Sequence, residues 1–421
     1  MILLKNMVTN KLNILFLIII PVSFFYGFYL SEDSSGGGQI DYNHILNNYE
    51  LIFKNKFSEI DWGLYESSRF PLMYFFFKTY LPFKIEFLKI NIFVVSILSS
   101  IILYFALKQK FFFLKEQRNF FFYILSSYIL LLSPYFRTSA YWLLEENFGF
   151  LFIISASFFL YCSFNKNSKF IYFYIFLTIF FSYIAFYSSQ NLYYFVIANF
   201  VLFIREFGFT SKKTLFVIFL NIILFSPLII FHKFFLTTLT SAISVGRFSI
   251  DLFNIVDIGC IIFIYIIPIY FLFIKLNENF LKKIKKNLIK YLIFILLFIL
   301  FFFQYQTETT GGGALQKFLL FIFDDSFQFK IIYLFSSSLS YLFILEVLKK
   351  EKIFFVFIFC NLFLYIFIEN IYQEYFDPSL LLFCFLYFNK IEFLSNIKIK
   401  ILNVYLILFL TGANVYYIYL Q

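Results

Sequence analysis

Apolar residues occur in long blocks along this chain of 421 residues, and short polar stretches separate the blocks. A block of about 15 to 20 apolar residues makes a helix that can cross a bilayer, because a helix satisfies its own backbone hydrogen bonds in hydrocarbon. The pattern predicts an all-α, polytopic integral membrane protein in which residues 1–421 form a single transmembrane domain. By this length rule we expect about 13 transmembrane helices, at residues 12–30, 86–107, 120–134, 148–164, 170–187, 191–205, 214–232, 258–274, 288–304, 330–348, 353–369, 378–390 and 400–419.

Residues 31–82 form the longest segment between two predicted spans. Acidic and amide side chains are dense over residues 31–70, between two very apolar blocks. The next segment, Pro71–Leu81, is apolar but too short to span, so we expect an interfacial helix whose Lys78 reaches the lipid headgroups. Residues 31–82 are therefore predicted to form an acidic loop with interfacial helices, and any catalysis is expected there.

Charge predicts which way the helices cross. Lys5 and Lys11 precede the first apolar block, which we interpret as an uncleaved signal anchor with its N-terminus in the cytoplasm. If the helices alternate, the inner loops gather most of the Lys and Arg and the outer loops most of the acids, as the positive-inside rule requires. The acidic loop is then the first outer loop, and the C-terminus lies outside. Short loops, a composition rich in Phe, Ile, Lys and Asn, and no outer Asn-x-Ser/Thr sequence favour a bacterial inner (cytoplasmic) membrane.

Composition narrows the class further. Hydrophobic residues make up 62% of the chain and charged residues only 14%, which excludes a water-soluble protein. The net charge of +10 then reflects orientation among membrane lipids, and we do not expect nucleic acid as a partner. The four cysteines lie within apolar blocks and are expected to be small buried residues. With only His44 and His232 in the chain, a zinc site is not expected.

The first outer loop holds the best candidates for chemistry. Asp33 and Asp41 follow the first span closely, so both are expected near the membrane surface. His44 follows Asp41 by three residues, and one helical turn would place both on the same face. The triplet Gly36-Gly37-Gly38 either forms an anion-binding nest or is a flexible loop leaving a helix end.

Later outer loops add further polar residues. Arg137 lies just past a predicted span, where it either binds a phosphate bidentately or anchors to headgroups. Glu145-Glu146-Asn147 begins a predicted helix, where acids also suit the helix dipole. A second triplet, Gly311-Gly312-Gly313, repeats the first, and Asp324-Asp325 interrupts an apolar stretch, which favours a buried or cavity-lining position.

The predicted architecture resembles the GT-C glycosyltransferase superfamily. The shared features are a signal-anchor helix, a long acidic first outer loop with an Asp soon after the membrane, and about a dozen further helices. Asp41-Tyr42-Asn43-His44 is similar to the acidic-to-His element in the family's first loop. Trp62 followed by Ser68-Arg69-Phe70-Pro71-Leu72-Met73-Tyr74 is similar to the aromatic entry to the family's second helix.

Two more local matches lie later in the chain. Glu145-Glu146-Asn147 resembles the acid–Asn pair that often opens a middle helix of the family. Tyr372-Gln373-Glu374-Tyr375-Phe376-Asp377-Pro378 resembles the late Arg-Tyr-x-x-Pro element, but Gln373 and Glu374 stand where a basic residue is usual. Phosphate binding by this late loop is therefore not supported by the match.

The resemblance implies a glycosyltransferase that moves a sugar from a polyprenyl-phosphate carrier to a glycan or lipid acceptor at the outer face. The catalytic base would be Asp41 or, second, Asp33. Binding of the phosphate and the substrates would fall to His44, Arg69, Arg137, Glu145, Glu146, Asn147, Arg247, Gln373 and Tyr375. No residue is assigned as a metal ligand and the resemblance fixes no cofactor, although a divalent metal shared by Asp33 and Asp41 stays open.

Two other functions compete with this interpretation. A polymerase or ligase of lipid-linked glycans usually concentrates basic residues in one large late outer loop, whereas the largest outer loop here is the first and is acidic. A flippase or transporter usually places charges and broken helices near the bilayer midplane. The predicted spans are almost free of charge, and Asp324-Asp325 is the feature that favours a transporter.

Overall fold

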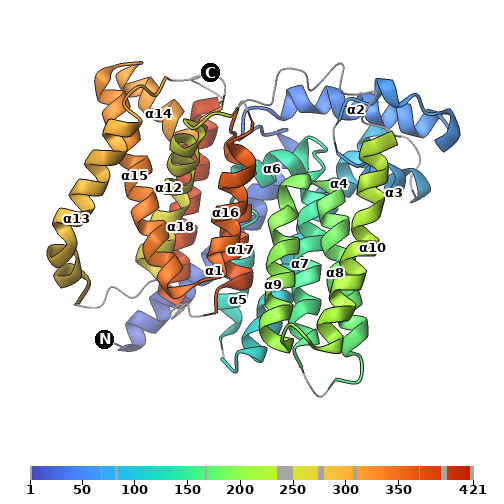
Figure 1. Cartoon of the computed structure of the whole chain (residues 1–421), viewed down its shortest axis with the longest axis horizontal. Coiled ribbons are helices and arrows are strands. Elements are labelled where there is room, and N and C mark those ends of the chain that lie inside the picture. Colours follow the sequence, from blue (N-terminus) through green and yellow to red (C-terminus); the bar gives the residue numbers. More distant parts are fainter. Residues whose placement is uncertain are drawn as a thin grey trace. The chain divides into compact units, whose positions relative to one another are not determined.

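A computed structural model describes residues 2–67, 69–80, 84–116, 118–165, 168–234, 250–273, 279–306, 311–368, 370–389 and 396–417 (Figure 1). Over these residues all regular structure is helical. The α-helices are α1 (Ile2–Tyr29), α2 (Gly38–Lys54), α3 (Leu72–Tyr80), α4 (Ile85–Phe113), α5 (Phe120–Ser127), α6 (Pro134–Tyr141), α7 (Glu146–Ser163), α8 (Ile171–Ser188), α9 (Tyr193–Phe207), α10 (Lys212–Phe234), α12 (Asn254–Phe273), α13 (Asn279–Phe301), α14 (Gly313–Phe323), α15 (Phe327–Lys350), α16 (Phe354–Tyr365), α17 (Ser379–Tyr387) and α18 (Asn396–Val415). Four short 3-10 helices are η1 (Phe57–Glu59), η2 (Trp62–Leu64), η3 (Gln190–Leu192) and η4 (Gln373–Tyr375).

Seven helices of the described part are long and apolar enough to cross a membrane: segments of α4, α7, α8, α10, α12, α15 and α18. Large apolar side chains on the outside of the helices stay uncovered, such as Ile222, which is 67% exposed, and Phe363, which is 63% exposed. A surface of this kind needs lipid around it, because in water it would drive aggregation. The all-helical class is confirmed, and the chain has the features of a membrane-embedded protein; the number of 13 spans stays a prediction.

One expected span is interrupted in the structure. Residues 120–134 were predicted to form one continuous helix, but α5 ends at Ser127 and α6 begins at Pro134. Ser133 accepts a hydrogen bond from the Phe136 backbone N–H, and a proline in the first helical position needs no N–H partner, so the pair starts a new helix. The prediction of a single helix here is wrong, and the connection between α5 and α6 is almost entirely buried.

The chain divides into two compact units, which we describe separately. The first unit comprises residues 1–245 and 403–421, and the second comprises residues 246–402. In the first unit α4, α7 and α8 pack side by side, and α2 and α3 lie across one end of these helices (Figure 1). That end carries the acidic loop of the sequence.

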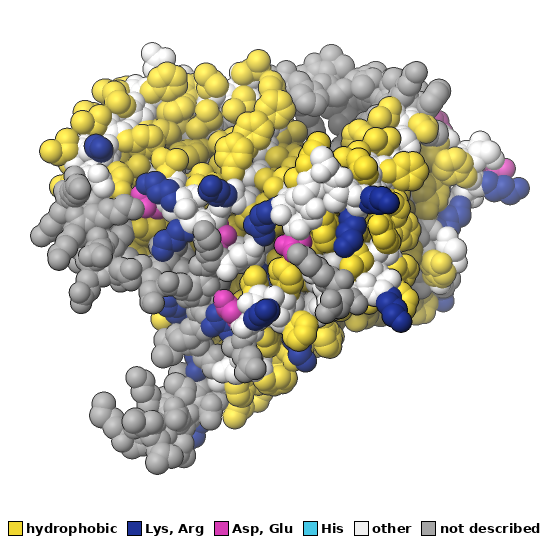
Figure 2. All heavy atoms as spheres, turned by 60° about the horizontal axis from the view of Figure 1, so that its bottom comes forward, with side chains coloured by type: hydrophobic (Ala, Val, Ile, Leu, Met, Phe, Trp, Pro, Cys, Tyr) yellow, Lys and Arg dark blue, Asp and Glu magenta, His cyan; other side chains and the backbone are white. Residues whose placement is uncertain are grey.

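The two ends of the first unit differ in charge. The loops between α7 and α8 and between α9 and α10 lie at the end away from α2 (Figure 1), next to basic residues that include Lys169, Arg205 and Lys213. Figure 2 looks from this side and shows Lys and Arg side chains distributed over the face. The last turn of α18 lies at the opposite end, because Asn414 donates a hydrogen bond to Glu32 beside α2. This distribution is what the positive-inside rule requires if α2 lies outside, and the orientation in the cell stays a prediction.

The second unit corrects the expectation for Asp324 and Asp325. Both side chains are exposed between α14 and α15, where Asp324 has a positive φ of 49° and Ser326 caps α15. The prediction that they are buried or line a cavity is wrong, because polar residues are what a helix end and the following cap require. The buried carboxylates of this unit, among its described residues, include Asp257, on α12.

Candidate functional site

Asp33 positions the start of α2. Its carboxylate accepts hydrogen bonds from the backbone N–H of Gly36 at 2.9 Å and of Gln39 at 3.4 Å, and the Thr138 hydroxyl lies 3.4 Å away. The first N–H groups of a helix have no partner within the helix, so a carboxylate there both caps it and suits its dipole. Ser34 donates to the Pro134 carbonyl at 2.9 Å, which fixes the same turn to α6. Asp33 is thus occupied in holding α2 on α6.

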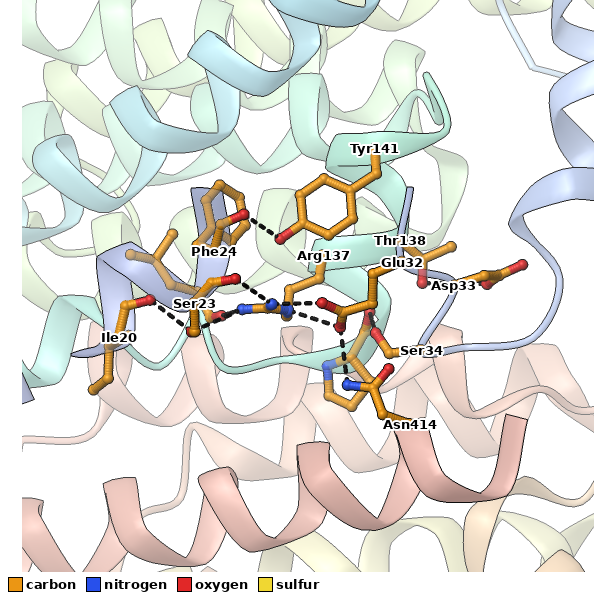
Figure 3. Close-up of polar contacts among 12 residues, drawn as sticks. Ile20, Ser23, Phe24, Glu32, Asp33, Ser34, Arg137, Thr138, Tyr141 and Asn414 are labelled. Atoms are coloured by element: carbon orange, nitrogen blue, oxygen red, sulfur yellow. Dashed lines mark hydrogen bonds and ion pairs between the residues drawn. The ribbon is translucent and has the colours of Figure 1, made fainter. Parts of the chain in front are cut away.

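Arg137 makes an intramolecular ion pair. Its guanidinium binds Glu32 through two contacts, Nε–Oε1 at 2.9 Å and Nη2–Oε2 at 2.5 Å (Figure 3). The remaining donors reach the Ser23 carbonyl at 2.8 Å and the Leu131 carbonyl at 3.2 Å. Asn414 adds a hydrogen bond to Glu32 at 3.1 Å, and Arg137 is only 2% exposed. Of the two roles considered from sequence, the structure displays neither, because Arg137 would have to release Glu32 to bind a phosphate.

A second arginine faces two buried acids. Arg69, in the loop before α3, forms ion pairs with Glu145, at 3.6 Å, and with Glu146 at the start of α7. Glu145 is 2% exposed and Glu146 is 4% exposed, so one guanidinium serves two buried carboxylates. Oε2 of Glu146 has no hydrogen-bond partner among the described residues. Such an oxygen is a strong acceptor, since leaving it unpaired costs free energy.

Burial changes the ionisation of Glu145. Removal of water raises its pKa from the usual 4.5 to about 7, although the Arg69 charge and a hydrogen bond with Tyr74 act in the opposite direction. The negative charge of Glu146 also raises the pKa. Carboxyl groups whose pKa is raised in this way occur often at functional sites.

Asp41 lies on the first turn of α2, close enough to these charges for them to affect its ionisation. Its side chain is at the surface, yet surrounding protein atoms remove enough water to raise its pKa above the usual value. The negative charge of Glu146 raises the pKa further, while Arg69 and His44 lower it. The sequence-predicted Asp41, Arg69, Glu145 and Glu146 therefore belong to one electrostatic cluster.

His44 is oriented by a residue that the sequence did not single out. Its Nδ1 lies 2.7 Å from Oε2 of Glu66. Glu66 is itself held, because Asn47 donates to both of its oxygens at 3.2 and 3.3 Å and Asn48 accepts from its backbone N–H at 2.8 Å. Glu66 lies 22 residues from His44, so only the return of the loop onto α2 reveals the pair.

Asn147 joins neighbouring helices through buried hydrogen bonds. Its amide nitrogen donates to the Ser96 hydroxyl at 2.7 Å and to the Phe136 carbonyl at 2.8 Å, and the residue is fully buried. These contacts join α7 to α4 and α6 directly behind Glu145 and Glu146. Asn147 therefore supports the acids from inside the bundle.

Of three further predicted site residues, one lies outside the described residues and two lie in the second unit. Arg247 lies outside the described residues. Gln373 and Tyr375 lie in the second unit, where Gln373 accepts from the Ala314 N–H at 2.7 Å and donates to Tyr265 at 2.8 Å. Tyr375 stacks on Tyr365 with ring centres 4.8 Å apart. Gln373 thus contacts the start of α14, and Tyr375 packs against α16.

The glycine triplet before α14 is also engaged with protein. The Gly312 N–H donates to the Ile371 carbonyl at 2.8 Å, so this amide is not free for an anion. All three glycines have positive φ, which a residue with a side chain rarely adopts.

The donor set does not fit a metal shared by Asp33 and Asp41. Within the described ranges, no three His, Cys, Asp or Glu side chains are grouped as a metal would require. The Asp33 oxygens already accept backbone N–H groups, which a metal would displace. The chemistry of the site is therefore derived from its own side chains.

Together, the apolar helices and the charged cluster beside α2 define a helical membrane protein with a polar site at one end of its first unit. Comparison of the chain with protein-family models, with curated proteins and with solved structures finds no match. Its activity is therefore argued from the residues of the site.

Proposed function

We propose that the chain is a glycosyltransferase that moves a sugar from a polyprenyl-phosphate carrier to an acceptor hydroxyl of a glycan or lipid at the outer face of the membrane. The observation that carries the proposal is the convergence of separate predicted motifs. Arg69 of the first loop contacts Glu145 and Glu146 at the start of α7, and their charges act on Asp41 of α2. These four residues come from three stretches of the sequence.

The chemistry follows from these charges. In the transfer, the acceptor oxygen forms a bond to the anomeric carbon, and the bond from that carbon to the phosphate oxygen breaks. The phosphate leaves with the electron pair, and the acceptor proton passes to a base. Asp41 suits this role because its raised pKa strengthens it as a base, and taking up a proton relieves its repulsion by Glu146.

Glu145 and Glu146 are better suited to bind the hydroxyl groups of a sugar than to bind the phosphate. Glu146 offers an unpaired oxygen that can accept a hydrogen bond from a sugar hydroxyl. Arg69 offers N–H donors, and Glu145 offers a carboxyl group whose pKa is raised. A group with more acids than cations repels a phosphate, so we assign Arg69, Glu145 and Glu146 to the sugar or the acceptor. Arg137 and Asn147 then position the site, and Asp33 caps α2.

An apolar groove of the first unit supports a lipid substrate. It has a volume of about 500 Å³ and lies between α1, α4 and α5. Its walls are mainly aromatic and aliphatic, and include Phe24, Phe25, Ile101, Phe105 and Ile124. A groove of this kind matches an isoprenoid chain, because apolar contact is what such a chain offers.

A transporter remains the second candidate, on one observation. Asp257 lies in a helix that is apolar enough to span, and its Oδ1 accepts hydrogen bonds from Tyr305 and Tyr333, each at 2.7 Å. Carboxylates within membrane helices often mark ion or substrate pathways. The exposed Asp324 and Asp325 no longer support this reading.

The test is to incubate the purified protein with polyprenyl-phosphate sugars and measure the polyprenyl phosphate released. We expect release with at least one sugar, and we expect Asp41→Asn to lower the rate by about 10²- to 10⁴-fold. Glu50→Gln is the matched control, because Glu50 is an exposed acid of the same helix. No release from any carrier, or a normal rate in Asp41→Asn, contradicts the proposal.

A further inference from the structure

A departing phosphate needs a cation, and most cations around α2 are already engaged. Arg137 is paired with Glu32, and Arg69 faces the two buried acids of α7. Lys78 donates to the backbone carbonyl of Ile52 at 2.6 Å and to that of Asn55. None of these three side chains can bind a phosphate without giving up protein contacts.

Lys89, near the start of α4, is held differently. Its ammonium lies 4.5 Å from the ring centre of Tyr42 and 5.2 Å from that of Trp142. Among the described residues no carboxylate lies within ion-pair distance of it, not even Glu86 one turn earlier. Aromatic faces attract a cation but do not neutralise it, so Lys89 keeps its charge available for an anion.

The two rings form a fixed support for this cation. Tyr42 and Trp142 meet edge to face with centres 5.6 Å apart, and the Trp142 indole N–H donates to the Glu32 carbonyl at 3.1 Å. The Tyr42 hydroxyl makes no hydrogen bond within the described part of the chain, and all three side chains are partly exposed. An ammonium and a hydroxyl are thus both open to a ligand.

We propose that Lys89 and the Tyr42 hydroxyl bind the phosphate of a lipid-linked phosphate. The membrane-spanning segment of α4 begins at Glu86, and Phe87 and Ile90 beside Lys89 are 45% and 48% exposed, so the ligand approaches from a lipid surface. Lysine with Tyr and Trp at such a boundary is suited to phosphate at headgroup depth. Naming the ligand as the sugar carrier rests on the function proposed above. Tyr42 follows Asp41 directly, which places the phosphate beside the base.

The fluorescence of Trp142 can be used to measure this binding. It has only two tryptophans, Trp62 and Trp142, so Trp62→Phe leaves Trp142 as the single indole. We expect farnesyl phosphate to change the emission of this protein saturably, and farnesol, which has no phosphate, to leave it unchanged. In this background Lys89→Gln should raise the Kd at least about tenfold, because a charge-assisted contact is lost. Lys89→Arg should restore most of the affinity, and Tyr42→Phe should weaken it less than Lys89→Gln.

Lys84→Gln is the matched control, since Lys84 is an exposed lysine at the start of the same helix. It should leave the Kd unchanged. An unchanged Kd in Lys89→Gln, with Lys89→Arg also normal, overturns the proposal. Equal competition by inorganic phosphate, or by phosphatidylglycerol in nanodiscs, also overturns it, because the site would then bind any phosphate or any anionic headgroup.

The binding site and the function fail in different ways. If sugar transfer occurs and Lys89→Gln leaves both KM and kcat unchanged, the phosphate site is wrong and the transferase stands. If Lys89-dependent binding of farnesyl phosphate is found but no sugar carrier is turned over, the transferase is wrong and the phosphate site stands.

Discussion

At the scale of single residues, the Arg137–Glu32 pair is expected to matter for stability first. The Arg137 side chain is buried and the Glu32 side chain is 10% exposed, so removing one partner leaves an uncompensated charge largely away from water, at a cost of about 3 to 5 kcal/mol. We therefore expect Glu32→Gln and Arg137→Met each to lower the thermal unfolding midpoint in detergent. The double variant should lose less than the sum, since it leaves no lone charge.

An exposed ion pair on α2 serves as the control for the Arg137–Glu32 pair. Lys54 and Glu50 form an i,i+4 ion pair on the surface of α2, and such pairs contribute little in water. Lys54→Ala should leave the midpoint nearly unchanged. Additive losses in the Glu32 and Arg137 variants would contradict direct coupling.

The raised pKa of Glu145 predicts how the stability of the folded protein changes with pH. Its pKa is raised from 4.5 to about 7 on folding, so between these values the folded protein binds more protons than the unfolded protein. Stability must then fall as pH rises from about 4.5 to about 7, by roughly 3 kcal/mol from this residue. Glu145→Gln removes that dependence, and the difference between wild type and variant should flatten above pH 7.

The measurement is the unfolding midpoint of both proteins across that pH range. Glu50→Gln serves again as the control, because Glu50 is an exposed acid on the surface of α2. A Glu145→Gln profile parallel to that of the wild type would show that Glu145 ionises normally in the folded protein.

Some of this site was predictable from sequence and some was not. Residues Asp41, Glu145 and Glu146 stand out because acids are rare in a chain of this composition. The partners of Arg137 were hidden, because Glu32 lies 105 residues away and nothing local indicates the pair. Lys89 was hidden for another reason: it lies within a predicted span, and only Tyr42 and Trp142 show why a charge is kept there.

At the scale of elements, the position of α2 depends on a close approach to α6. A Cβ added to Gly38 would lie 2.6 Å from Thr138 Cγ2 and 2.6 Å from Trp142 Cδ1, whereas one added to the neighbouring Gly37 would meet nothing within 4 Å. Gly38→Ala should therefore displace the start of α2 and destabilise the protein by about 1 to 3 kcal/mol. Release of polyprenyl phosphate should fall with it, because Asp41 follows three residues later.

Gly37→Ala is the matched control for that change, and it should keep both the unfolding midpoint and the rate. Equal behaviour of the two variants would mean that α2 is not seated against Thr138 and Trp142 as described.

Hydrophobic blocks predicted most helices well, but not their interruptions. The block at residues 120–134 contains enough apolar residues for one span, and Ser133-Pro134 breaks it through backbone chemistry that hydropathy does not measure. The residues 378–390 similarly give only α17, Ser379–Tyr387. Short buried helices of this kind are tolerated because neighbouring helices, rather than lipid, surround them.

At the scale of the whole molecule, the charge distribution of the first unit predicts sidedness. Lys56 lies in the loop after α2, and Lys212 begins α10 at the other end. In a variant without the four native cysteines, we expect Lys56→Cys to react with an impermeant maleimide in right-side-out vesicles. Lys212→Cys should react only in inverted vesicles. The reverse labelling pattern would contradict the outer position of the proposed site.

The hydrogen bond between Asn414 and Glu32 connects residues 382 positions apart in the chain. A ribosome synthesises Glu32 long before Asn414, so the first loop must wait for α18 before its arrangement is complete. The N-terminal loop therefore reaches its final set of contacts only after the C-terminal helix α18 has been synthesised. A nascent chain truncated before residue 396 would leave the Arg137–Glu32 pair without its amide partner. Pulse-labelled intermediates should then become protease-resistant around Glu32 only after the last helix has been inserted.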